Sequence, residues 1–322
     1  MTMKRIRIIV HTLMILFLLG LSASIAAKER NKEPAKTNTA HLPDVIWRDP
    51  GNIASLNLLY GAGGKEQAPD PNGTFKFVAE VMEGTSPKFD VKDAQGVQWR
   101  VKLGEETQSE TAATRLLWAA GYFVDEDYYL PELKVTGLPK LHRGGGFVSK
   151  GGTVRSARLK RHLKGVKKLG SWDWFDNTTL NQREMNGLRV MMSLLNNWDL
   201  KEMNNSIYEV DGERRCVVSD MGATLGNTGS PVTRSKSDPK GYANSIFIGK
   251  AEPNFVDFVQ HGKMEKVTKH IPRADAKWLG QRLSQLSAEQ IRDSFRAAGY
   301  TPEEIEWYAK AVQKRIAELN AL

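Results

Sequence analysis

Two aspartates and an asparagine in the second half of the chain are of the residue types that bind a divalent cation. Asp199 and Asn204 precede an apolar segment that Asp211-Gly212 interrupts, and Asp220 follows that segment. Asp-Gly between two apolar runs is typical of a two-residue hairpin turn, and a hairpin brings the start of its first strand beside the end of its second. We therefore expect Asn204 and Asp220 to be neighbours, with Asp199 at the same edge.

Carboxylate and amide oxygens at one edge suit a hard cation such as Mg²⁺, which keeps waters and phosphate oxygens in its shell. Phosphoryl transfer needs this arrangement, because metal ions offset charge on the phosphates while a carboxylate orients the attacking group. Other chemistries fit less well, since the histidines lack the pairing of a zinc site and no Gly-x-Ser-x-Gly motif occurs. The single cysteine, Cys216, lies in an apolar run, which favours a buried structural thiol.

The same segment resembles the catalytic segment of protein kinases. Asp199-Leu-Lys-Glu-Met-Asn204 is similar to their Asp-Leu-Lys-x-x-Asn catalytic loop, and Asp220-Met-Gly222 to their Asp-Phe-Gly turn. The chain departs from that pattern because it lacks Gly-x-Gly-x-x-Gly and carries Asn197-Trp198 before the first aspartate. Both departures resemble more distant kinase-like groups, namely the HipA-type toxin kinases, the phosphatidylinositol kinases and the secreted kinase-like families. The layout is also similar to that of exported bacterial envelope proteins.

The resemblance implies a phosphate-holding lysine on the third strand of the N-terminal lobe and an acidic partner on the following helix. Lys102 lies near the end of the third predicted strand. We assign its partner as Glu110, in the first turn of the predicted helix, in preference to Glu105 and Glu106, which are expected to precede that helix.

The turn between the first two predicted strands occupies the position of a kinase phosphate loop. It contains Gly84 and Ser86, so that backbone N–H groups and a hydroxyl would cradle phosphates there. We expect ATP and Mg²⁺ as cofactors on the strength of the resemblance.

The roles that the resemblance implies are distinct. Asp199 would orient the acceptor hydroxyl, Lys201 would offset charge on the transferring group, and Asn204 and Asp220 would hold the metal. Asn205 would replace Asn204 if the hairpin began one residue later. Lys102, held by Glu110, would position the α- and β-phosphates. The alternative function is a catalytically inactive binding or scaffolding protein of the cell envelope that keeps the kinase fold.

The elements that position these residues indicate an α+β, two-lobed kinase-like fold. Period-two alternation predicts strands around 75–81, 89–91 and 97–103, and a helical pattern follows at 109–121. Helical spacing returns at 182–195, where a methionine-rich stripe indicates core packing. Three further helices are predicted over 276–286, 287–298 and 302–319. We place a β-rich N-lobe at 46–152 and a mostly helical C-lobe with the catalytic hairpin at 153–322.

The N-terminus has the pattern of a secretory signal peptide over residues 1–26. Lys4, Arg5 and Arg7 precede an apolar run at 12–21, and small residues that fit a cleavage site follow. The apolar run is shorter than the roughly 20 residues that span a bilayer, which makes a permanent anchor the lesser alternative. Residues 27–45 are expected to form a flexible tether. We therefore predict export to the periplasm or the extracellular space.

The chain has a net charge of +9, and its basic excess is concentrated between Arg155 and Lys168. A solvated face is the simplest interpretation of this run, and weak contact with an anionic membrane surface is an alternative. A nucleic-acid partner is not expected, because the run contains no interleaved aromatic residues. We expect a monomer whose acceptor is a protein or a small molecule.

Overall fold

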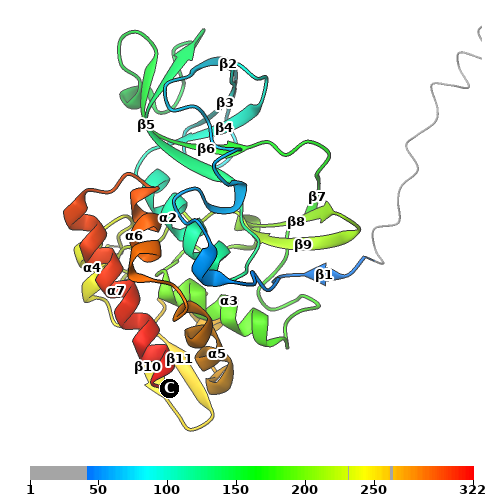
Figure 1. Cartoon of the computed structure of the whole chain (residues 1–322), viewed down its shortest axis with the longest axis vertical. Helices are drawn as coiled ribbons and strands as arrows, with labels where there is room; N and C mark the ends of the chain where they lie inside the picture. The colour runs from blue at the N-terminus through cyan, green and yellow to red at the C-terminus, as the bar shows by residue number, and fades with distance from the viewer. Residues whose placement is uncertain (1–41, 231, 262–263) are drawn as a thin grey trace, which may run out of the picture. The chain divides into compact units, whose positions relative to one another are not determined.

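The computed structural model describes residues 42–230, 232–261 and 264–322 (Figure 1). The predicted signal peptide at 1–26, and the part of the predicted tether before residue 42, lie outside the described residues. Within the described ranges, no helix combines the length and the apolar character that crossing a bilayer requires. The described chain from Pro43 onward forms one compact unit.

A closed five-stranded barrel forms the N-lobe, in the order β2-β3-β4-β6-β5. The predicted alternation produces it, because Phe75, Phe89, Trp99 and Val101 all point into the barrel core. Neighbouring strands are antiparallel except for β2 and β5, which run parallel and close the barrel. The strands are β2 (Thr74–Val81), β3 (Lys88–Lys92), β4 (Gln98–Leu103), β5 (Asp127–Thr136) and β6 (Thr153–Arg161).

The predicted lobe boundary at residue 152 needs correction, because β6 follows it and pairs with both β4 and β5. The basic run between Arg155 and Lys168 obscures the alternating pattern of this strand in the sequence. Val154, Ala157 and Leu159 are fully buried in the barrel, while the neighbouring cations Arg158 and Lys160 pair with acidic side chains. The N-lobe sheet therefore continues to Arg161. Part of the basic run is thus held in ion pairs and does not form a fully solvated face.

Helix α2 (Glu106–Ala119) connects the barrel to the rest of the unit and begins three residues before the predicted start at 109. Its buried residues include Ala112, Ala113 and Leu116. Arg115 forms a buried ion pair of 3.0 Å with Asp127 at the start of β5, which ties the helix to the sheet. This ion pair fixes the orientation of α2, so that the helix face that carries acidic residues points toward β4.

The C-lobe contains the predicted hairpin and the predicted helices. Asp211 and Gly212 both have positive φ, which is the two-residue turn that an Asp-Gly pair favours. The hairpin belongs to a sheet of order β1-β9-β8-β7, whose first strand lies inside the range predicted as tether, so that the paired chain begins at Asp44. The strands are β1 (Asp44–Val45), β7 (Lys167–Gly170), β8 (Asn205–Val210) and β9 (Glu213–Val218).

Helices build most of the C-lobe core, with α2 packing between them and the barrel (Figure 1). The methionine stripe of α3 is buried, as predicted. Ser287 and Thr301 form capping boxes at the starts of α6 and α7. The helices are α3 (Arg183–Leu194), α4 (Pro239–Asn244), α5 (Arg273–Leu283), α6 (Ala288–Arg296) and α7 (Pro302–Asn320). A small sheet contains β10 (Ile248–Ala251), β11 (Phe255–Phe258) and β12 (Ile271–Pro272). The described chain thus has the predicted α+β, two-lobed architecture.

Candidate active site

A cleft of about 690 Å³ is bounded by barrel strands, by α2 and by the β8–β9 hairpin. Four predicted site residues line it, namely Lys102, Glu110, Asn204 and Asp220. The other four predicted residues do not belong to its lining, but they contact residues around it. These four are Gly84, Ser86, Asp199 and Lys201.

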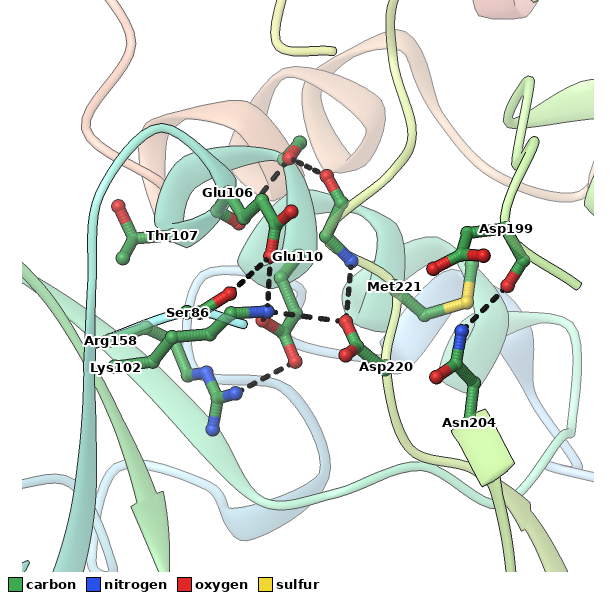
Figure 2. Close-up of polar contacts among 12 residues, drawn as sticks. Ser86, Lys102, Glu106, Thr107, Glu110, Arg158, Asp199, Asn204, Asp220 and Met221 are labelled. Carbon is green, nitrogen blue, oxygen red and sulfur yellow. Dashed lines mark hydrogen bonds and ion pairs between the residues drawn. The ribbon is translucent and has the colours of Figure 1, made fainter. Parts of the chain in front are cut away.

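Lys102 is the centre of the polar contacts in this cleft (Figure 2). Because alternate residues of β4 face the barrel core, Lys102 faces α2 and is only 1% exposed. Its Nζ lies 2.6 Å from Glu106 Oε2, 2.9 Å from Glu110 Oε2 and 3.1 Å from Asp220 Oδ1. Burial lowers the pKa of Lys102, but the surrounding carboxylates outweigh it and raise that pKa above its ordinary value. The lysine is therefore charged.

Glu110 is paired with Lys102, which is the contact that the sequence predicts. Its second carboxylate oxygen accepts a hydrogen bond of 2.8 Å from Arg158 Nη2 on β6. Glu110 is 1% exposed, so both of its oxygens are held by cations inside the protein. The arrangement fixes the Lys102 ammonium at the wall of the cleft.

Glu106 is a site residue that the sequence analysis placed outside the helix. It belongs to the first turn of α2, one turn from Glu110, so both carboxylates reach the same lysine. Glu106 also accepts from Lys236 at 2.8 Å and from the Ser86 hydroxyl at 3.0 Å. Burial raises the pKa of Glu106, but the two ammonium groups outweigh it and lower that pKa to about 2. The i, i+4 spacing of the two glutamates was the available signal.

The predicted phosphate turn is held in place by an arginine that the sequence analysis did not single out. Arg143 donates from Nη1 to the Gly84 carbonyl at 2.6 Å and from Nη2 to the Val81 carbonyl at 2.9 Å. Gly84 has a φ of +69°, which glycine adopts without strain. The Ser86 hydroxyl donates to Glu106, so the turn is connected to the Lys102 cluster.

The hairpin edge brings the three predicted oxygen-bearing residues together. The backbone N–H of Asp220 donates to the Asn204 carbonyl at 3.3 Å, and Asn204 Nδ2 donates to the Asp199 carbonyl at 2.6 Å. The Asp199 carboxylate forms an ion pair of 2.8 Å with Lys201, whose side chain is 62% exposed. Asn205 is buried and donates to the Trp172 carbonyl, so it does not replace Asn204 in the cleft.

The Asn204 and Asp220 side chains fit a weakly held divalent cation. In Figure 2 the Asn204 side-chain oxygen lies on the side of Asp220, since its nitrogen is engaged by Asp199. Within the described ranges, no three His, Cys, Asp or Glu side chains form a cation site. Two protein oxygens suffice for Mg²⁺ when phosphate oxygens and waters complete its shell. Burial raises the pKa of Asp220 and Lys102 opposes it, with a net lowering that keeps the carboxylate ionised.

Gly222 closes the turn after Asp220 in direct contact with α2. Its N–H donates to Asp220 Oδ1 at 3.2 Å, and its carbonyl accepts from the Ser109 hydroxyl at 2.8 Å. The residues that directly follow it are packed inside the protein. Thr224 and Leu225 are both fully buried.

Replacing Gly222 with alanine is expected to destabilise the protein by about 1–3 kcal/mol, because overpacking forces the surroundings to shift. The added Cβ would lie 2.7 Å from Glu106 Cβ. Chemical denaturation measures the effect, and Gly146→Ala is the control because nothing lies within 4 Å of a Cβ there. Equal stability of Gly222→Ala and the control would contradict the close packing of Gly222 on α2.

Comparison with protein-family models and with curated proteins finds no match for this chain. Solved structures include similar ones at low identity. The Helicobacter pylori proinflammatory kinase CtkA is 11% identical, with a TM-score of 0.48 over 77% of this chain and 96% of that chain. The Golgi casein kinase with Mn/ADP bound is 9% identical, with a TM-score of 0.36 over 92% of this chain and 91% of that chain. In the cleft of this chain, a strand lysine pairs with a helix glutamate opposite the hairpin aspartate.

Proposed function

We propose that this chain binds ATP with a divalent metal ion in the cleft and transfers a phosphoryl group to an acceptor hydroxyl. The observation that carries the proposal is the position of Lys102, which is held by Glu110 and reaches Asp220 from a strand 118 positions earlier. A buried ammonium that lines a cleft and is held by helix glutamates is suited to phosphate oxygens on one side and a metal-binding aspartate on the other. Export to the periplasm or the extracellular space is part of the proposal.

Each site residue would have a separate role in the reaction. Lys102 would hold α- and β-phosphate oxygens, and Asn204 and Asp220 would bind a metal ion that offsets phosphate charge. Asp199 would orient the acceptor hydroxyl and take its proton as the acceptor oxygen bonds to the γ-phosphorus and the bond to the β-phosphate oxygen breaks. Lys201, exposed at the surface and paired with Asp199, would offset charge on the transferring group.

A thermal-shift titration with ATP, with and without Mg²⁺, tests the proposal. Saturating ligand at about 100 times Kd is expected to stabilise the protein by about 2.7 kcal/mol. The shift should require Mg²⁺ and should be lost in Asp220→Ala, since the aspartate is assigned to the metal. Glu252→Ala is the matched control, because this exposed carboxylate pairs only with Lys250 among the described residues.

The same titration separates the two functions that the sequence leaves open. If millimolar ATP and Mg²⁺ leave the melting temperature of the unsubstituted protein unchanged, nucleotide binding is excluded and the scaffolding function is favoured. If ATP stabilises Asp220→Ala as much as the unsubstituted protein, the metal assignment is wrong.

A further inference from the structure

Lys88 is a cation of the cleft to which the roles above assign nothing. It is the first residue of β3 and directly follows the turn that contains Gly84 and Ser86. It lines the cleft and is half-buried. A Cβ built on Gly84 would lie 3.3 Å from Lys88 Nζ, so the ammonium is beside the turn.

Lys88 lies directly opposite Lys102 across the β3–β4 pair. Side chains at paired positions project from the same face of a sheet. Both lysines therefore enter the cleft from one wall, with Lys88 nearer the turn. Two cations side by side are suited to a ligand that carries several anionic oxygens in a row. A single carboxylate does not carry such a row of oxygens.

The charges around the two lysines are unequal. Lys102 contacts three carboxylates, and the neighbouring Arg158 contacts Glu110. Lys88 has no ion pair and no side-chain hydrogen bond within the described residues. Burial lowers the pKa of Lys88, and the positive charge of Lys102 lowers it further. An anion between the two ammonium groups would relieve this repulsion.

We propose that Lys88 is a second phosphate-binding lysine, which contacts the polyphosphate of a nucleoside di- or triphosphate at the end of the cleft next to the Gly84–Ser86 turn. This inference rests on the proposed function, because it assigns a further residue to the same ligand. Arg143 supports it by fixing the turn through the Gly84 carbonyl. The turn and Lys88 then form one side of the phosphate site, and Lys102 forms the other.

Calorimetric titration of adenosine, AMP and ATP in the presence of Mg²⁺ tests the assignment. Lys88→Met is expected to weaken ATP binding about tenfold, which corresponds to about 1.4 kcal/mol, and to leave adenosine binding unchanged. Lys88→Arg should restore most of the loss, since the charge is kept. Lys92→Met, at the exposed end of the same strand, should bind ATP like the unsubstituted protein. ATP binding that is equally tight in Lys88→Met overturns the inference.

Labelling of lysines with an amine-reactive reagent gives a second test. If Lys88 had a purely structural role, its reactivity would not change when ligand is added. ATP with Mg²⁺, or inorganic tripolyphosphate, should protect Lys88 from labelling and leave Lys92 reactive. If ATP binds and Lys88 stays unprotected, the inference fails while the proposed function stands. If tripolyphosphate protects Lys88 and ATP does not bind, the proposed function fails while the phosphate site stands. Binding of neither ligand overturns both.

Discussion

Lys102→Met is expected to lower the free energy of unfolding by about 3–5 kcal/mol, because removing one partner of a buried ion pair leaves uncompensated charge. The substitution would leave the carboxylates of Glu106, Glu110 and Asp220 around an apolar side chain. Only Glu106 and Glu110 keep another cationic partner, Lys236 and Arg158 respectively. Urea denaturation measures the effect, and Lys76→Met, exposed on β2, is the control.

The pH dependence identifies the cause of this loss. Burial raises the pKa values of the Glu106 and Asp220 carboxyls and Lys102 opposes it, so without the ammonium both pKa values should rise above their unfolded values and the folded state of the variant should bind more protons. Stability contributed by a raised carboxyl pKa is present at low pH and is lost as the pH rises. The deficit of Lys102→Met relative to the unsubstituted protein should therefore be smaller at about pH 5 than at about pH 8. A deficit that is independent of pH would point to lost packing instead of lost charge.

A second substitution tests which carboxylate matters most. Glu106 is the closest to Lys102, at 2.6 Å. Adding Glu106→Gln to Lys102→Met should recover part of the stability, because it removes one of the three carboxylates that repel one another once the ammonium is gone, while the shape of the side chain is kept. A double-mutant cycle should show a coupling energy of about 1 kcal/mol or more, whereas strictly additive effects would contradict direct contact.

Local sequence rules predict the parts of this site that lie on single elements. The Asp211-Gly212 turn sets the hairpin register, and that register alone brings Asn204 beside Asp220. Alternation along β4 points Lys102 away from the barrel core and toward the following helix. Both inferences need only the geometry of one hairpin or of one strand and its neighbour.

Contacts between distant segments were not predictable in the same way. Lys236 reaches Glu106 across 130 positions, and nothing in the local pattern of either residue indicates the pair. Arg143 binds the Gly84 turn across 59 positions because β5 and the loop after it pack beside β2. The basic composition of β6 obscures the strand in the sequence. The alternation typical of a strand is visible only when the small and apolar residues are considered and the charged residues between them are ignored. Tertiary packing decides each of these contacts.

Asp199→Asn is expected to lower the rate of ADP formation from ATP by about 10²- to 10⁴-fold, which is the usual contribution of a positioned general base. The amide keeps the shape of the side chain but takes up the acceptor proton poorly. ATP with Mg²⁺ should stabilise the variant as much as the unsubstituted protein, because Asp199 is assigned to the acceptor and not to the nucleotide. Losing the exposed ion pair with Lys201 should cost at most about 1 kcal/mol of stability.

The comparison of rate with binding separates a catalytic aspartate from a structural one. Glu202→Gln, on the turn between Asp199 and β8, is the matched control and should keep the full rate. If Asp199→Asn retains the rate, another group accepts the proton and the assignment is wrong. If the unsubstituted protein binds ATP with Mg²⁺ and forms no ADP in the presence of candidate protein and small-molecule acceptors, binding is its function. In that case the polar contacts around Lys102 serve to hold a nucleotide without transferring its phosphate.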